Sequence, residues 1–238
     1  MIEITEFSNY SDDNSNIIIW GGRSCKNSFV RFYGKNCRVV FGEGCRVEGA
    51  RINFHCDNGT MIVGKNSEIK GGMKIGLNSS IIIGDNLTIT RNPLISTAEG
   101  SSVKIGNDCM FAADNQILSD DQHPIFYMNG KRANPSRSIE IEDRVWLSTR
   151  AAVLSGSRIG SGSVIGFSSV AKGDYPRNAV VAGVPGKVVK EGVFWERHNI
   201  NNNPPFYFPE PISVISEPER SGAQRRISRF LAYFRKIL

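Results

Sequence analysis

Apolar residues return at every sixth position through the second half of the chain. The longest run starts at Ile141 and holds an apolar residue at each sixth position as far as Ala171. Four residues beyond each of these positions, up to Ser169, stands a small or β-branched residue. Strands repeat with a period of about 2 and helices with about 3.6. A period of six therefore indicates short strands separated by tight turns.

The same period appears earlier in the chain in other phases. Its apolar positions are Val63, Ile69, Ile75 and Ile81, then Ile83, Ile89 and Ile95, then Ile105, Phe111 and Ile117. Glycine often follows the apolar residue and, with asparagine, supplies the positive φ angles that tight turns need. Stacked units of this kind bury each coil against its neighbours. We therefore predict an all-β parallel β-helix over residues 28–190, preceded by an N-terminal segment over residues 1–27.

The repeat is interrupted once and then stops. Counting on by six from Ile117 reaches no aliphatic residue at the next three positions. Residues 119–138, rich in Asp, Asn and Pro, predict a long loop that leaves the coil, and long loops on rigid scaffolds often carry function. Residues 191–238 are predicted to form a C-terminal strap followed by a helix.

Composition places the chain among ordinary soluble proteins. Of its 238 residues, 40% are hydrophobic and 22% are charged. No apolar run approaches the ~20 residues of a membrane-spanning helix, and the polar, acidic first residues are unlike a secretory signal. We therefore expect a cytoplasmic protein, with peripheral contact at the inner membrane left open.

The cysteines and histidines predict neither a disulfide framework nor a metal site. The five cysteines are widely spaced with no C-x-x-C pair, and the three histidines lie far apart. Three of the cysteines occupy the small-residue position of the repeat, namely Cys37, Cys45 and Cys109. Cysteine acts there as a small buried hydrophobe, and we expect all five to be structural.

The positive charge is confined to the C-terminus. Residues 220–238 hold six of the 29 basic residues and no acid, so the rest of the chain has 23 basic and 23 acidic residues. Apolar residues in this tail recur at helical spacing and predict a basic amphipathic helix: Ile227, Phe230, Leu231, Phe234 and Leu238. The helix either caps the coil or lies on an anionic membrane. No interleaving of aromatic and basic residues predicts a nucleic-acid partner.

His123, which precedes Pro124, is the candidate catalytic group of the loop. Histidine can serve as a general base near neutral pH. A base of this kind removes a proton from a substrate group, while hydrogen-bond donors stabilise the negative charge that develops. Asp120 or Asp121 is available to orient the ring. The alternative is a solvated loop histidine.

The repeat and the loop together resemble a known superfamily, the hexapeptide-repeat acyltransferases. The resemblance covers roughly residues 30–190. It is best over residues 105–190, which look like the galactoside, maltose and xenobiotic O-acetyltransferase branch, in pieces such as IGNDCMFAADNQILSDDQHPIF and VPGKVVK. It implies a left-handed coil, acetyl-coenzyme A as the donor, homotrimers with sites between subunits, and His123 as the base.

The same resemblance implies roles for further residues. Asn115 would contact the acceptor, and Trp146 would form a wall of the active site. The implied donor-binding positions are Thr149, Phe167, Ser168, Lys172, Lys187 and Lys190. Each of them has a plainer interpretation as a turn residue, a packed aromatic or a solvated lysine. The chain also departs from the family pattern, with Leu147-Ser148 in place of Ile-Gly and Phe167 in place of a small alanine.

Three basic residues of the loop bear on the acceptor. Lys131, Arg132 and Arg137 are suited to attract a carboxylate-bearing sugar, although ordinary loop solubility also explains them. The favoured hypothesis is an acetyl-coenzyme A-dependent O-acetyltransferase of a bacterial surface saccharide, in capsule or lipopolysaccharide, with sialic acid as one such acidic sugar. The alternatives are an acetyltransferase of an antibiotic or a nucleotide sugar, and a non-catalytic scaffold whose basic tail binds membrane or nucleic acid.

Overall fold

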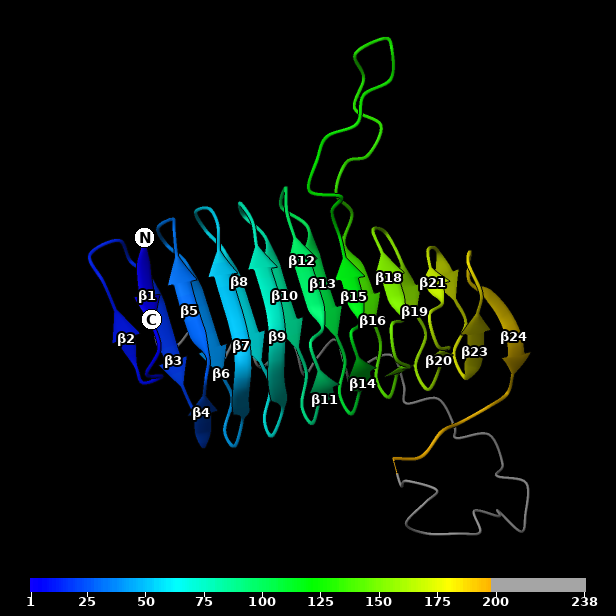
Figure 1. Ribbon diagram of the computed structural model, residues 1–238, viewed down its shortest axis with the longest axis horizontal. Coiled ribbons are helices and arrows are strands. Elements are labelled where there is room, and N and C mark those ends of the chain that lie inside the picture. The colour runs from blue at the N-terminus through cyan, green and yellow to red at the C-terminus, as the bar shows by residue number, and fades with distance from the viewer. Residues whose placement is uncertain (198–238) are drawn as a thin grey trace, which may run out of the picture. The chain divides into compact units, whose positions relative to one another are not determined.

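The computed structural model describes residues 1–197, of which Met1–Glu196 form one compact unit. The predicted amphipathic helix, and all of the predicted strap beyond residue 197, lie outside the described residues. Within residues 1–197 every regular element is a strand. The prediction of an all-β coil is confirmed: the strands build a β-solenoid of about 7 turns (Figure 1).

The strands form three sheets, each running along the solenoid. The first sheet contains β1 (Ile2–Ile4), β4 (Ser24–Lys26), β5 (Phe29–Phe32), β7 (Arg46–Phe54), β9 (Glu68–Ile75), β12 (Leu94–Thr97), β15 (Gln116–Leu118), β18 (Ala152–Leu154) and β21 (Val170–Ala171). The second contains β2 (Tyr10–Ser11), β3 (Ile17–Trp20), β6 (Arg38–Phe41), β8 (Thr60–Val63), β10 (Ser80–Ile83), β13 (Ser102–Ile105), β16 (Ile139–Ile141), β19 (Arg158–Ile159) and β22 (Asp174–Tyr175). The third contains β11 (Thr88–Arg91), β14 (Met110–Ala113), β17 (Trp146–Leu147), β20 (Val164–Ile165), β23 (Ala179–Ala182) and β24 (Lys187–Glu191).

The six-residue period places one aliphatic side chain per strand in the core. Ile141, Leu147 and Val153 fall on the second, third and first sheets in turn, and each is at most 1% exposed. In the register of the strands, Val153 lies opposite Ala171, which is 18 residues later, or three repeats. Earlier coils are longer, and Ile81 lies opposite Val103 across 22 residues. The longer coils explain why the period is less regular in the first half.

Small residues fill the corners between sheets, as the second frame of the repeat predicts. Ser157 and Ser163 are buried, and their hydroxyls donate to backbone carbonyls at 2.6 Å and 2.9 Å respectively. Cys37, Cys45 and Cys109 are fully buried at equivalent positions. Burial raises the pKa of the Cys37 and Cys45 thiols. The remaining two cysteines differ, since Cys25 is half-buried and Cys56 is exposed. The expected role as a small buried hydrophobe therefore does not apply to Cys56.

Antiparallel strands stand at both ends of the solenoid, whereas the pairs between successive coils are parallel. At the N-terminal end β1 pairs antiparallel with β5, and β2 with β3. At the other end β24 pairs antiparallel with β23. Residues 1–27 thus contribute strands to the same sheets as the coils that follow. Chain reversal covers terminal strand edges that would otherwise be open to another chain.

The chain leaves the coil between β15 and β16 and returns without a change of register. Ile117 on β15 pairs with Val153 on β18, and Ile105 on β13 pairs with Ile141 on β16. Residues 119–138 form the excursion, which projects from the corner between the first and second sheets (Figure 1). The coil is therefore a continuous support for this loop.

Candidate functional site

The root of the loop is anchored in the core by buried polar contacts. The Ser119 hydroxyl lies 2.7 Å from the Ser101 hydroxyl and donates to the Ser96 carbonyl at 3.1 Å. Asp120 is 7% exposed and accepts a hydrogen bond from the Ser96 hydroxyl at 2.8 Å. The Arg137 amide donates to the Ser119 carbonyl at 3.1 Å, which closes the loop at its base.

His123 lies on the outgoing arm of this loop and is exposed. Its backbone is held from both sides: the amide donates to the Asp121 carbonyl at 2.7 Å, and the carbonyl accepts from Asn134 Nδ2 at 3.0 Å. Within residues 1–197 the imidazole itself makes no hydrogen bond. Asp120 and Asp121, the two candidates for orienting the ring, are engaged with Ser96 and Asn134 instead. The ring nitrogens therefore remain available to an external hydroxyl.

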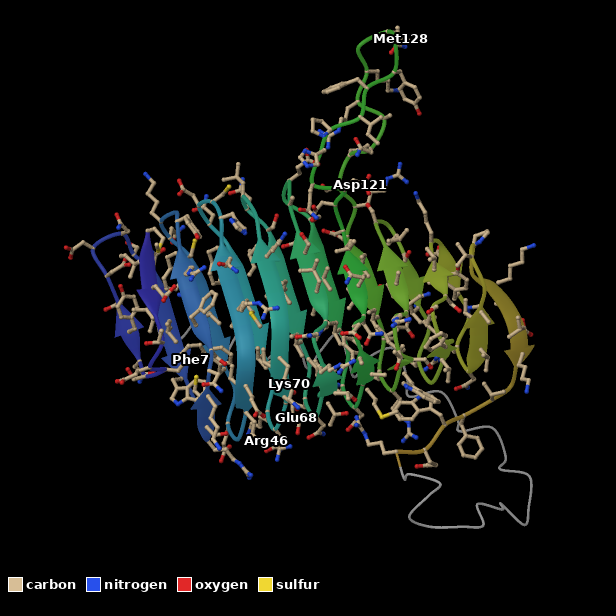
Figure 2. All side chains as sticks on the ribbon, in the orientation of Figure 1. Phe7, Arg46, Glu68, Lys70, Asp121 and Met128 are labelled. Carbon is tan, nitrogen blue, oxygen red and sulfur yellow. The ribbon has the colours of Figure 1, made fainter. Side chains whose placement is uncertain are left out.

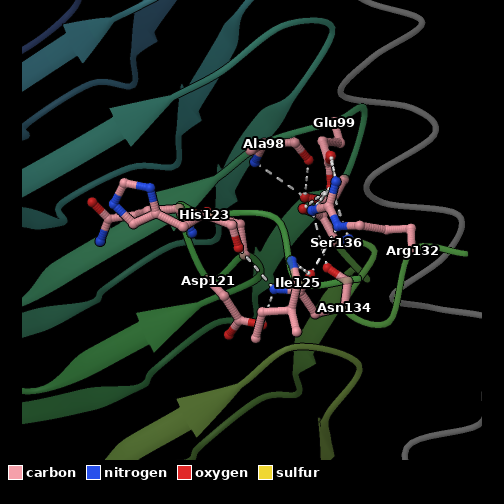
Figure 3. Close-up of polar contacts among 11 residues, drawn as sticks. Ala98, Glu99, Asp121, His123, Ile125, Arg132, Asn134 and Ser136 are labelled. Carbon is pink, nitrogen blue, oxygen red and sulfur yellow. Dashed lines mark hydrogen bonds and ion pairs between the residues drawn. The ribbon is translucent and has the colours of Figure 1, made fainter. Parts of the chain in front are cut away.

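Asn134, on the returning arm, connects the two arms of the loop (Figure 3). Its side-chain oxygen accepts from the Ile125 amide at 2.7 Å and from Arg132 Nε at 2.8 Å. Its side-chain nitrogen donates to Asp121 Oδ2 at 2.9 Å and to the His123 carbonyl. One amide group thus fixes the His123 carbonyl and the Ile125 amide, on the two sides of Pro124. No motif or spacing in the sequence predicts this role for Asn134.

The tip of the loop is apolar and exposed. Ile125, Phe126 and Tyr127 are 57–58% exposed, and Met128 projects fully from the end of the loop (Figure 2). The Tyr127 amide donates to the carbonyl of Lys131 at 2.9 Å, which closes the tip as a tight turn. Side chains of this kind are unusual on a free surface, since large exposed apolar patches commonly mark contact sites.

The three basic residues predicted to attract an acidic sugar have different surroundings. The Arg132 guanidinium faces the Glu99 carboxylate with two hydrogen bonds of 3.0 Å and 3.3 Å, so its charge is already paired. Lys131 and Arg137 are exposed at the tip and the foot of the loop. Arg132 is therefore poorly placed to bind an acceptor carboxylate, whereas the other two remain candidates.

Asn115, predicted to contact the acceptor, lies inside the coil. Its side chain is fully buried at the corner between β14 and β15. Its Nδ2 donates to the Ser148 carbonyl at 2.6 Å, and its Oδ1 is buried with no hydrogen-bond partner in the described part of the chain. The contact of Asn115 with an acceptor sugar therefore stays a prediction. Its position instead supports a structural role, in which the amide ties two successive coils together.

Trp146 lies on a different face of the coil from the loop. It is half-buried on β17 of the third sheet, with its ring 6.1 Å from that of Trp195. Trp195 in turn donates from Nε1 to the Arg144 carbonyl at 2.7 Å. The loop with His123 leaves from the corner between the other two sheets. A single chain therefore does not bring Trp146 and His123 together on one face.

Three of the predicted donor-binding residues share one corner of the solenoid, between the third and first sheets. Thr149 and Ser168 are adjacent there in successive coils, and the Ser168 amide donates to the Thr149 carbonyl at 3.0 Å. Phe167 beside them is 66% exposed. The Arg150 guanidinium lies 6.0 Å from its ring centre, a neighbour that sequence reasoning missed.

The predicted lysines lie elsewhere on the coil. Lys172 follows β21, at the corner from which the loop also departs, and is exposed. Lys187 and Lys190 are both exposed on β24, which closes the third sheet. The six donor-binding candidates thus divide between one corner and two other locations. Within residues 1–197 the arrangement does not form a closed site.

Surface hollows of the described residues lie away from His123. One is formed over β4, β7 and β9, with Lys26, Arg46 and Glu68 among its lining residues. Another lies over β13, β16 and β19 at the foot of the loop, between Lys104 and Arg158. Residues 1–197 contain no cluster of metal-ligating side chains. In that same range no helix has the length and apolarity to span a membrane.

Comparison with known proteins connects this fold to saccharide acetylation. No family model matches the sequence. The chain is 31% identical over 177 residues to the putative lipopolysaccharide biosynthesis O-acetyl transferase WbbJ of Escherichia coli (strain K12), covering 66% of this chain and 87% of that protein. It is 34% identical over 134 residues to the polysialic acid O-acetyltransferase of Escherichia coli O1:K1, covering 56% of this chain and 43% of that protein. The chain thus matches under half the length of the second relative.

Two crystal structures have a similar fold. The polysialic acid O-acetyltransferase OatWY superposes with a TM-score of 0.72 at 29% identity, over 80% of this chain and 93% of that one. The polysialic-acid-specific acetyltransferase NeuO superposes with a TM-score of 0.65, also at 29% identity, over 79% and 92% of the two chains.

The coil, the single excursion and these matches define a class, the acyltransferases built on hexapeptide repeats. Within that class the chain belongs to the O-acetyltransferase branch that includes the lipopolysaccharide, polysialic acid and galactoside O-acetyltransferases. The predicted enzyme class is thereby confirmed. The family uses thioesters of coenzyme A as acyl donors.

Proposed function

We propose that this enzyme transfers an acetyl group from acetyl-coenzyme A to a hydroxyl of an acidic bacterial surface polysaccharide, with His123 as the general base. The observation that carries the proposal is the state of His123. Its backbone is held between Asp121 and Asn134 while its imidazole is exposed and free of hydrogen bonds within residues 1–197. A base must reach a substrate hydroxyl. The backbone of His123 is held in place, while the ring nitrogens have no hydrogen-bond partner within residues 1–197.

The chemistry needs only a base and donors for the oxyanion. An imidazole nitrogen of His123 takes the proton of the acceptor hydroxyl while its oxygen attacks the thioester carbonyl carbon. A C–O bond forms and the carbonyl electron pair moves to oxygen, where hydrogen-bond donors stabilise it. The tetrahedral intermediate then breaks its C–S bond. The imidazolium returns its proton to the departing thiolate, so the products are the acetyl ester and free coenzyme A.

The corner around Phe167 is the proposed donor site. Coenzyme A combines an aromatic base, amides and anionic phosphates. The exposed ring of Phe167 beside Arg150 suits a flat base, and the backbone turns at Thr149 and Ser168 suit the amides. Lys172, Lys187 and Lys190 are exposed cations for the phosphates. Trp146 would line the passage between donor and acceptor.

The proposed acceptor is a polymer that carries carboxylates. The similar proteins named for polysialic acid and lipopolysaccharide support this class of acceptor. In this chain Lys131 and Arg137 are exposed on the loop that carries His123, and their charges suit a carboxylated sugar. Sialic acid polymers are therefore the first substrates to test.

A homotrimer would explain the scattered site. His123 and the Phe167 corner lie on different parts of one chain, and the apolar loop tip is exposed. If the loop of one subunit reaches the donor corner of the next, both features are accounted for. Sedimentation at concentrations where the enzyme turns over should give the mass of a trimer, unchanged by reducing agent. An active monomer would contradict this assembly.

Three earlier predictions stay predictions. They are the left-handed sense of the coil, the C-terminal helix with its capping or membrane role, and a cytoplasmic location with peripheral contact at the inner membrane. Truncation after residue 219 distinguishes the two roles of the helix. Loss of binding to anionic vesicles supports membrane contact, and a lowered melting temperature supports capping.

The direct test of the proposed function is a donor-release assay on a panel of purified polysaccharides. The panel should contain polysialic acid, a lipopolysaccharide with acidic sugars, and a neutral polysaccharide as the matched control. We expect release of free coenzyme A with an acidic polymer, together with an alkali-labile acetyl ester on that polymer. Turnover with the neutral polymer alone would contradict the acidic-acceptor proposal.

A further inference from the structure

Glu99 connects the loop to the coil that precedes it. This residue occupies the turn between β12 and β13, with a φ of 54°. Its carboxylate accepts two hydrogen bonds from the Arg132 guanidinium, at 3.0 Å and 3.3 Å. It accepts two more from the amide and the hydroxyl of Ser136, at 3.0 Å and 2.7 Å. All four donors belong to the returning arm of the loop (Figure 3).

The contacts continue from Glu99 to the backbone of His123. Arg132 donates from Nε to the side-chain oxygen of Asn134 at 2.8 Å and from its terminal nitrogen to the Asn134 carbonyl at 3.2 Å. Asn134 then donates to the His123 carbonyl at 3.0 Å and accepts from the Ile125 amide at 2.7 Å. Each link is a direct hydrogen bond, so displacement of Arg132 removes two of the contacts that hold Asn134, the group that fixes the His123 carbonyl.

We propose that Glu99 is a positioning residue, which holds His123 in register with the acceptor through Arg132 and Asn134. The proposal rests on His123 as the base. Within residues 1–197 the Glu99 carboxylate bonds to Arg132 and Ser136 and not to His123 itself. Its effect on the reaction is exerted through the geometry of the loop.

The charge state of Glu99 suits this role. The Ser136 hydroxyl and amide, followed by the Arg132 guanidinium, lower the pKa of the carboxyl below its usual 4.5. We call the contacts of Glu99 with Arg132 and Ser136 the brace. Because the carboxyl pKa is lowered, the brace is intact at every pH above the usual pKa. It is lost only as the pH falls through the lowered pKa. The brace is therefore fully formed at neutral pH, where a histidine base works.

The brace should matter little to global stability. The Glu99 side chain is 45% exposed, and ion pairs with this much exposure contribute little to the free energy of unfolding. Catalysis is more sensitive, because a displacement of the base by about 1 Å can cost on the order of 100-fold in rate. A positioning role and a stabilising role therefore predict different results for the same variant.

The test compares Glu99→Gln with Glu43→Gln. Glu43 is a matched control, since it also forms an exposed ion pair at a turn of the coil, with Lys65 at 3.4 Å. For Glu99→Gln we expect kcat to fall by roughly 10- to 100-fold, with KM for donor and acceptor and the melting temperature near wild type. Hydrogen exchange should accelerate in the loop peptide over residues 119–138 and should stay unchanged in the peptides of the coil.

A double variant identifies the route through Arg132. If Glu99 acts through Arg132, the double variant Glu99→Gln/Arg132→Gln should have the same kcat as whichever single variant is the less active. Additive losses would overturn the proposal. So would wild-type kcat in Glu99→Gln, or a loss of kcat accompanied by a lower melting temperature and faster exchange throughout the coil.

The two proposals fail separately. Full kcat in His123→Ala would overturn the assignment of the base and leave the exchange experiment to decide whether Glu99 braces the loop. Loss of kcat in His123→Ala with no effect of Glu99→Gln would overturn the positioning role alone.

Discussion

The coil and the loop at residues 119–138 are stabilised by different interactions. Each coil places aliphatic side chains such as Ile117 and Val153 in the core with no exposed surface. Residues 121–131 of the loop are all exposed and are held by polar contacts to Asn134, while Glu99 holds Arg132 of the returning arm. Burial stabilises the coil collectively, whereas the shape of the loop depends on a few directional bonds.

The difference separates stability from activity. A substitution in the coil removes buried apolar surface but leaves the loop's polar network in place. A substitution in the loop changes the position or chemistry of His123 and removes almost no buried surface. The two regions should therefore respond to mutation in opposite ways.

The largest effect should follow from His123→Ala. We expect kcat to fall by about 10²–10⁴, the usual contribution of a general base, at an unchanged melting temperature. His55→Ala is the matched control, because His55 is an exposed histidine at a turn of the coil and stacks on Tyr33 at 5.5 Å. Steady-state kinetics of both variants check the prediction. Equal kcat values for the two would remove His123 from the mechanism.

Substitutions in the core of the coil should lower stability and leave kcat unchanged. Ile81→Ala on β10 is expected to lower the free energy of unfolding by about 2–5 kcal/mol, because Ile81 is fully buried between Met61 and Val103. The adjacent Ile82→Ala is the control, since that side chain points outward on the same strand. Denaturant unfolding measures both. Similar losses for the two would show that the alternation of faces on β10 is wrong.

The junction of the two regions should give an intermediate loss. Asp120→Ala removes the acceptor of the buried Ser96 hydroxyl and of the Gln122 amide. An unsatisfied buried donor costs about 1–3 kcal/mol in unfolding free energy. We also expect faster hydrogen exchange at the root of the loop. Unchanged exchange there would mean that Asp120 does not anchor the loop.

The core of the coil was predictable from the sequence, whereas the contacts that hold the loop were not. The six-residue frame predicted Ile141, Leu147 and Val153 as core residues and the long loop as an interruption, because a repeated burial pattern is written in residue type and spacing. The contact between Glu99 and Arg132 was not predictable, since it joins a turn of the coil to the loop and depends on loop geometry that no periodic pattern records. The burial of Asn115 was not predictable either, because a buried corner asparagine and an exposed one have the same sequence context.

The smallest effect should come from an exposed ion pair on the coil. Arg91 pairs with Asp114 at 3.4 Å, and the Arg91 side chain is 69% exposed. Arg91→Ala should change the unfolding free energy by less than about 1 kcal/mol, since ion pairs at the surface are weak. Thermal unfolding at two salt concentrations provides the measurement. A loss comparable to that of Ile81→Ala would show that surface charges also stabilise the coil.

The separation of stability from activity is tested most directly by measuring kcat and unfolding free energy on the same samples of His123→Ala and Ile81→Ala. We predict that His123→Ala loses activity and keeps its stability, and that folded Ile81→Ala loses stability and keeps its kcat for acetyl transfer to an acidic polysaccharide. If the two quantities fall together in either variant, the loop and the coil do not divide chemistry and stability between them.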